Sequence, residues 1–141
     1  MADIITIENN IKKYLKDGID KENFFYDFIS NYDFPVASIT RARNASKTVI
    51  KNKAMYEVVS EVSSPMARVT DMVKEVSEER NKPRIVIATN FNELAAIDTK
   101  TGDSLIIRIS ELPLHADFFL PWNGIEKVDY SRENPADIKA A

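Results

Sequence analysis

The sequence predicts an α/β (α+β) domain in which a mixed β-sheet is flanked by helices and a β-hairpin lies toward the carboxyl end. Three observations predict this class. Apolar residues recur every three to four positions over residues 4–29, as on one face of a helix. Residues 85–88 form a continuous apolar run, typical of a strand covered on both faces. Residues 94–98 and 104–109 favour strands and flank a turn that contains Gly102, which supplies the positive φ of a hairpin loop.

Two helices are predicted at the amino end. Their apolar stripes are Ile4, Ile7, Ile11, Tyr14 and Leu15 in the first, and Phe24, Phe25, Phe28 and Ile29 in the second. Gly18 ends the first helix, because glycine is the preferred residue just past a helix end. The second helix is predicted to begin at Asp20, whose side chain caps the amino end, and to break over residues 31–35.

The middle of the chain is predicted to contain one strand and one helix. Residues 35–53 are polar and basic, and both a short helix and a loop remain open there. Residues 54–62 are rich in β-formers and predict a strand. Ser64 followed by Pro65 is a strong helix start, and we expect this helix to end near residues 80–82.

The carboxyl third is predicted to hold a central strand over residues 84–89, the hairpin, and a helix over residues 110–119. A further helix is predicted to begin at residue 134, where Pro135 follows. A helix cut short at Ala141 would be an unusual natural terminus, so we expect an excised amino-terminal domain of a longer protein. A naturally frayed tail is the alternative.

The composition predicts a single domain that spans residues 1–141, with 44% hydrophobic and 29% charged residues. No apolar run approaches the roughly 18 residues of a membrane helix, and no signal peptide is present, so we expect no membrane partner. The absence of cysteine excludes disulfides and thiolate chemistry, and the single histidine, His115, excludes His-pair zinc motifs. We expect a cytoplasmic protein, because small secreted domains usually carry disulfides.

Basic residues are concentrated in one segment. Between residues 34 and 70 the only acids are Glu57 and Glu61. The basic residues predicted to bind DNA are Arg41, Arg43, Lys47, Lys51 and Lys53. Such residues contact phosphates without reading sequence, and a merely solvated face is the alternative.

The second half of the chain carries a family resemblance. Pro83–Val86 through Asn90–Phe91, Ser110–Leu112 with Phe118–Phe119, and Ala136–Ala141 are similar to the amino-terminal region of MmeI-like type II restriction–modification enzymes. Residues 1–82 match by element order alone, and that order resembles the PD-(D/E)xK nuclease core. The resemblance implies a bacterial DNA methyltransferase in which this region precedes a helical connector and an S-adenosylmethionine-dependent adenine methyltransferase domain. It therefore implies duplex DNA and the intramolecular methyltransferase domain as partners, with no cofactor inside this chain.

The catalytic pattern of that nuclease family is incomplete here. Family members that cleave DNA hold Mg²⁺ with an Asp on one strand and a Glu-x-Lys on the next, because carboxylates bind hard cations and the lysine positions water. Glu57 is the candidate match for the glutamate, but Val59 stands where lysine belongs and the aspartate position falls near Lys47. No Glu-x-Lys triplet occurs anywhere in the chain. We therefore predict no metal site and treat Glu57 as a weak catalytic candidate, with a solvated strand glutamate as the alternative.

The remaining notable residues have structural explanations. His115 is expected at or near the surface. Trp122 and the pair at 118–119 are expected in the core, with docking onto a following domain as the alternative. The oxygen-rich residues 98–103 suit a hairpin turn better than a Ca²⁺ site.

Three hypotheses about function follow. The first is a nuclease-inactive amino-terminal domain of a DNA methyltransferase that assists DNA binding or supports the methyltransferase. The second is an active Mg²⁺-dependent endonuclease in which Asp33 or Asp71 joins Glu57. The third is a protein interaction module without a nucleic-acid role.

Overall fold

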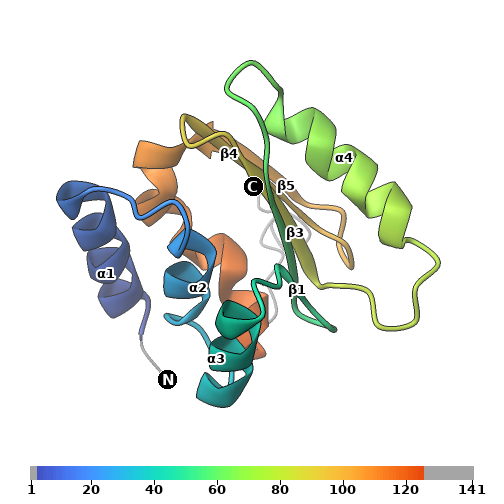
Figure 1. Cartoon of the computed structure of the whole chain (residues 1–141), viewed down its shortest axis with the longest axis horizontal. Coiled ribbons are helices and arrows are strands. Elements are labelled where there is room, and N and C mark those ends of the chain that lie inside the picture. The colour runs from blue at the N-terminus through green and yellow to red at the C-terminus, as the bar shows by residue number, and fades with distance from the viewer. Residues whose placement is uncertain (1–2, 126–141) are drawn as a thin grey trace, which may run out of the picture.

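The computed structural model describes residues 3–125, so the helix predicted from residue 134 lies outside the described residues. Its elements are α1 (Ile4–Asp17), α2 (Phe24–Ile29), α3 (Val36–Asn44), β1 (Val49–Ile50), β2 (Ala54–Val58), α4 (Pro65–Val76), β3 (Ile85–Thr89), β4 (Glu93–Asp98), β5 (Ser104–Arg108) and the 3₁₀ helix η1 (Ile109–Asn123). The five strands form one sheet, with α4 on one face and the other helices on the opposite face (Figure 1). This is the predicted mixed sheet flanked by helices.

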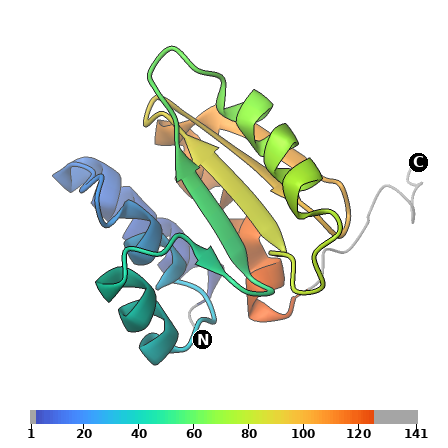
Figure 2. The same cartoon turned by 45° about the vertical axis from the view of Figure 1, so that its right-hand side comes forward.

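The sheet has the strand order β1-β2-β3-β4-β5. β2 and β3 are parallel and are connected by α4, whereas the other neighbouring strands are antiparallel. Every residue of β3 is buried, and its Ile87 lies opposite Tyr56 of β2 and Ala96 of β4. The apolar run therefore forms the predicted central strand, with α4 packed across it (Figure 2).

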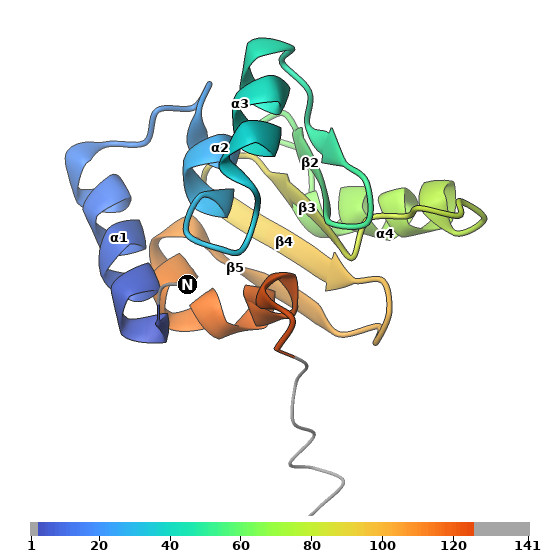
Figure 3. The same cartoon turned by 90° about the horizontal axis from the view of Figure 1, so that it is seen from below.

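The two faces of the sheet carry cores of different size. The larger core lies under the helical layer, where α1 and η1 lie side by side (Figure 3). At its centre the rings of Phe28, Phe119 and Trp122 contact one another, with centroids 4.9 to 5.9 Å apart. The smaller core joins Val69 and Met72 of α4 to Val86, Ala88 and Ala95 of the sheet. The predicted core packing is confirmed for Phe119 and Trp122, while Phe118 is partly buried.

The amino-terminal helices follow their capping residues. α1 begins where the Asp3 carboxylate accepts the Thr6 N–H at 2.8 Å, and it ends at Gly18, whose φ is +98°. α2 begins at Phe24 rather than at the predicted Asp20. The Asp20 carboxylate instead accepts the N–H groups of residues 22 and 23, which holds a separate turn ahead of the helix.

The middle of the chain differs from expectation at its boundaries. Residues 35–53, for which a short helix and a loop were both open, contain the helix α3 and then the short strand β1. The strand β1 was not predicted. The strand predicted over residues 54–62 ends at Val58, because the neighbouring β3 ends at Thr89 and the chain then turns. α4 ends at Val76 rather than near residues 80–82, since Val76 is its last buried position and the exposed residues after it offer no apolar face.

The hairpin is confirmed, and the element after it is a different kind of helix. β4 and β5 pair around a turn in which Gly102 has a φ of +81°. The helix predicted over residues 110–119 is the 3₁₀ helix η1. In an α-helix the rings of Pro113 and Pro121 would clash with the carbonyl groups four residues earlier, which disfavours that form here. His115 marks a kink inside η1, with a φ of −120°.

Candidate functional site

Glu57 lies on β2, on the face of the sheet covered by α4, and is held by an arginine. Arg68 of α4 donates two hydrogen bonds to the Glu57 carboxylate, from Nε at 2.8 Å and from Nη2 at 2.9 Å. The same guanidinium donates to the two carboxylate oxygens of Glu75, at 2.6 and 3.1 Å. One arginine therefore joins a strand carboxylate to a helix carboxylate, and each Glu57 oxygen already has a donor.

The electrostatics of this cluster are those of an ion-pair network. Hydrogen bonds to Glu75 and Glu57 raise the pKa of the Arg68 guanidinium, and the hydrogen bonds from Arg68 lower the pKa of Glu75. Because Arg68 is partly exposed and both glutamates are more so, water screens the attraction. The guanidinium thus supplies one positive charge that the two carboxylates share.

Mg²⁺ does not fit this arrangement. A hard cation takes several oxygen ligands, and here both oxygens of Glu57 accept hydrogen bonds from Arg68. Asp33 lies in the loop that precedes α3, on the opposite side of the sheet, where its backbone N–H donates to Asn123. Within residues 3–125, no three His, Asp or Glu side chains come together in a way that could hold a metal ion.

Two of the five predicted DNA-binding residues are engaged inside the protein. Arg43 donates to Asn23 Oδ1 at 2.7 Å and pairs with Asp27 at 3.4 Å. The Lys53 ammonium donates to the carbonyl oxygen of Trp122 at 3.1 Å. These side chains link α3 to α2 and the β1–β2 turn to η1, so they hold the fold together.

The other three basic residues are exposed at one corner. Arg41 and Lys47 line a hollow of about 580 Å³ between α3 and β1. Lys51 lies in the turn between β1 and β2. β1 is the edge strand of the sheet, with α3 just before it in the chain and β2 paired beside it (Figure 2). The structure therefore brings part of the predicted basic set together and assigns Arg43 and Lys53 to internal bonding.

A loop distant in sequence joins this corner. The N–H of Asn52 donates to the carbonyl oxygen of Asn81 at 3.2 Å, which places the β1–β2 turn beside the loop between α4 and β3. That loop carries the exposed residues Arg80 and Lys82. Neither residue was among the predicted DNA-binding residues. The available signal was the basic character of residues 80–84, but only the parallel pairing of β2 and β3 brings the two segments together.

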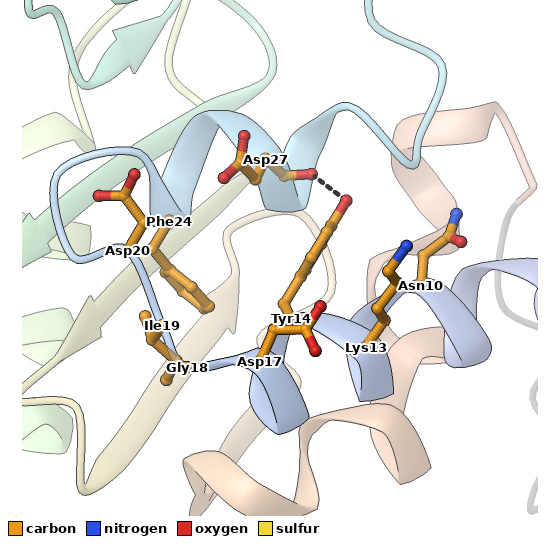
Figure 4. A pocket seen from close by; sticks show the side chains of 9 residues that line it. All are labelled: Asn10, Lys13, Tyr14, Asp17, Gly18, Ile19, Asp20, Phe24 and Asp27. Atoms are coloured by element: carbon orange, nitrogen blue, oxygen red, sulfur yellow. Dashed lines mark hydrogen bonds between the residues drawn. The ribbon is translucent and has the colours of Figure 1, made fainter.

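A second hollow, of about 360 Å³, lies between the end of α1 and the start of α2 (Figure 4). Its wall includes the aromatic rings of Tyr14 and Phe24, and the Tyr14 hydroxyl donates to the carbonyl oxygen of Asp27 at 3.1 Å. Two of its carboxylates are already bonded, because Asp20 accepts from Asn23 and Asp27 pairs with Arg43. The hollow contains no recognisable catalytic grouping.

The family assignment rests on a match along nearly the whole chain. Residues 2–141 match the model of the family described as "MmeI, N-terminal domain". The chain belongs to the MmeI N-terminal domain family. The resemblance seen at residues 83–141 therefore extends over the amino-terminal part, which element order alone had suggested.

One curated relative in this comparison is "DNA methyltransferase A" from Bacillus subtilis (strain 168). The two sequences are 34% identical over 145 residues, which covers 98% of this chain and 16% of the relative. The MmeI N-terminal domain described here thus spans a small part of that relative's length. No solved structure matches the fold. No helix in residues 3–125 is long and apolar enough to cross a membrane.

Proposed function

We propose that this MmeI N-terminal family domain serves a DNA methyltransferase by holding duplex DNA, and that it does not cleave DNA itself. The observation that supports the absence of cleavage is the Arg68 guanidinium, which is bound to both oxygens of Glu57. Val59 stands two positions later, where a nuclease of the PD-(D/E)xK type would need a lysine.

The chemistry of hydrolysis supports the inactive assignment. Phosphodiester cleavage of this type needs a cation that polarises the phosphate and a group that positions the attacking water. Glu57 is the sole matching carboxylate, and its charge is balanced by Arg68 rather than by a metal. Displacing Arg68 with Mg²⁺ would break two hydrogen bonds to Glu57 and two to Glu75 without gaining further carboxylate ligands.

The binding role rests on the exposed corner. Arg41, Lys47 and Lys51 come from three consecutive segments and are exposed. Lysine and arginine at such positions bind phosphates through charge, with affinity that falls steeply as salt rises. The DNA-modifying family to which the chain belongs makes duplex DNA the favoured polyanion.

The catalytic work of the whole protein is proposed to lie outside this chain. A methyltransferase domain elsewhere in the full-length protein would bind S-adenosylmethionine and methylate DNA, with the present domain as its intramolecular partner. The location that fits such an enzyme is the bacterial cytoplasm. A methyltransferase motif such as Asn-Pro-Pro-Tyr in the sequence after Ala141 would support this assignment.

Two measurements on the chain test the proposal. Supercoiled plasmid is incubated with the protein in Mg²⁺ and in Mn²⁺, and we expect it to remain uncut. Cleavage that is lost in Glu57→Ala would establish the active endonuclease instead. In parallel, a labelled duplex is titrated at several salt concentrations with the wild type and with the K47E/K51E variant.

The matched control for charge is K12E/K16E, which changes the net charge equally on α1 and alters exposed lysines away from the corner. We expect K47E/K51E to bind DNA more weakly than this control. Equal weakening by both variants would indicate attraction to net charge alone. An absence of DNA binding by the wild type at low salt would favour the interaction module.

A further inference from the structure

We propose that the DNA-contacting surface continues from Lys51 onto Arg80 and Lys82, so that the β1–β2 turn and the α4–β3 loop form one strip for a duplex phosphate backbone. This inference rests on the proposed function and adds residues that the basic segment of the sequence did not contain. We call Lys51, Arg80 and Lys82 the loop strip.

Backbone hydrogen bonds join the two segments of the loop strip. The Asn52 N–H donates to the Asn81 carbonyl oxygen at 3.2 Å, and the N–H of Ile85 donates to the carbonyl oxygen of Lys53 at 3.1 Å. Asn52 has a φ of +66°, a left-handed conformation that asparagine tolerates better than most residues. Because Lys51 precedes Asn52, its side chain starts from the same turn that Asn81 touches.

Arg80 and Lys82 flank the contact residue Asn81. Both are exposed, and neither makes a hydrogen bond or ion pair with another described residue. Their charges are therefore not neutralised within residues 3–125. Two acids, Glu78 and Glu79, precede Arg80 in the same loop, and neither forms an ion pair with Arg80 or Lys82. The N–H of Glu79 donates to the carbonyl oxygen of Val76, so the chain makes one further turn after α4 before it reaches Arg80.

The carboxyl end of the loop is anchored, which favours binding. Arg84 pairs with the fully buried Asp98 through Nε at 2.8 Å and Nη2 at 3.0 Å. Thr99 Oγ1 donates to the carbonyl oxygen of Pro83 at 2.7 Å. A loop already fixed in position loses less conformational entropy when its side chains engage a ligand.

The ligand class follows from the chemistry of the strip. It offers lysine and arginine side chains on two adjoining loops, without an enclosing pocket or an aromatic platform. Such a surface suits a regular row of phosphates rather than a single anion or an unstacked base. Duplex DNA supplies that row, and binding at the loop strip is expected to be insensitive to base sequence.

The test compares salt slopes of duplex binding for the intact chain. Each lost phosphate contact lowers the slope of log K against log salt by about 0.9, so R80E/K82E is expected to lower it by about 1.8. Over a fourfold rise in salt, this difference corresponds to about a 12-fold smaller loss of affinity than in the wild type. The charge-conserving variant R80K/K82R should keep the wild-type slope, and K12E/K16E serves as the matched control.

The outcomes separate this inference from the proposed function. Suppose that R80E/K82E has the same salt slope as K12E/K16E while K47E/K51E binds DNA weakly. Then Arg80 and Lys82 do not contact DNA, and the DNA-holding role stands. If the wild type does not bind duplex DNA, the proposed function is wrong, and so is the inference that the loop strip contacts DNA. Affinity for one duplex sequence far above that for others, with an unchanged slope in R80E/K82E, would also overturn the inference. Urea unfolding midpoints equal to that of the wild type would show that the variants are folded.

Discussion

Replacing Asp98 with alanine should destabilise the domain far more than breaking the Glu57–Arg68 pair. The Asp98 side chain is 0% exposed and that of its partner Arg84 is 14% exposed, whereas the Glu57 side chain is 40% exposed. Removing one member of a buried pair leaves the other charge desolvated and costs about 3 to 5 kcal/mol. Removing one member of an exposed pair costs about 1 kcal/mol or less. Asp98 also accepts the backbone N–H of Lys100 at 2.9 Å, so the hairpin turn loses an acceptor as well.

The assay is urea unfolding of the wild type, Asp98→Ala and Glu57→Gln. The unfolding free energies are compared with the same dependence on urea concentration for all three proteins. A loss of under 1 kcal/mol for Asp98→Ala would refute the reasoning, because it would place that pair in the class of exposed ion pairs. The double variant R84M/D98L provides an internal check. Apolar side chains in place of a buried ion pair are often neutral or stabilising, so this variant should recover most of the loss.

The pH dependence of this pair has a definite sign. Burial raises the pKa of Asp98, but the hydrogen bonds from Arg84 and from the Lys100 N–H, with the Arg84 charge, outweigh it and leave the pKa below its ordinary value. A lowered folded-state pKa means stability that is present above the unfolded value of about 3.9 and is lost as pH falls through the folded value. The stability gap between wild type and Asp98→Asn should therefore be constant near neutral pH and shrink below about pH 4. A gap that widens in acid would contradict the assigned direction.

Three further substitutions test the fold by the same unfolding assay. Trp122→Ala should cost about 3 to 5 kcal/mol, because its ring is buried among aromatic neighbours. The control Leu114→Ala, at a residue that is 73% exposed, should change the unfolding free energy by about 0.5 kcal/mol or less, and equal costs would contradict the core assignment. Ser64→Ala should cost about 1 kcal/mol through loss of the Ser64 Oγ bond to Ala67 N–H at 3.1 Å, and Ser64→Asp should restore it. Gly102→Ala should cost about 1 to 2 kcal/mol, because φ is +81° although no atom lies within 4 Å of the added methyl group; a neutral result would mean that the turn relaxes.

The elements that could be predicted are those whose signals are local. Gly18 and the pair Ser64–Pro65 mark helix ends through their own backbone chemistry, and the structure confirms both. The extent of a strand depends instead on its neighbour. β2 ends at Val58 because β3 offers no partner beyond Thr89, and no residue in β2 records that fact. The short strand β1 escaped prediction for the same reason.

The site was harder to predict than the fold because a charge in a sequence carries no record of its partners. Arg43 and Lys53 belong to the same basic segment as Lys51, yet they are bonded to groups from α2 and η1. Arg68 lies in the same acid-poor stretch of the sequence, but its role as the partner of Glu57 requires α4 to pack on that face of the sheet. The proposed contribution of the α4–β3 loop to DNA binding depends in turn on the parallel pairing of β2 and β3, which brings that loop beside the β1–β2 turn.

The basic residues fall into two groups according to how far their side chains are buried and whether they donate hydrogen bonds within the protein. Arg43, Lys53 and Arg84 are partly buried and each donates to a named internal acceptor, so they contribute to the fold. The basic residues at the exposed corner and along the α4–β3 loop are Arg41, Lys47, Lys51, Arg80 and Lys82. Exposed lysine and arginine contribute little to stability, and their desolvation cost is small when phosphate replaces water. Under the proposed function, charge reversal in the second group should therefore weaken DNA binding without changing the unfolding free energy, whereas reversal in the first group should lower the unfolding free energy.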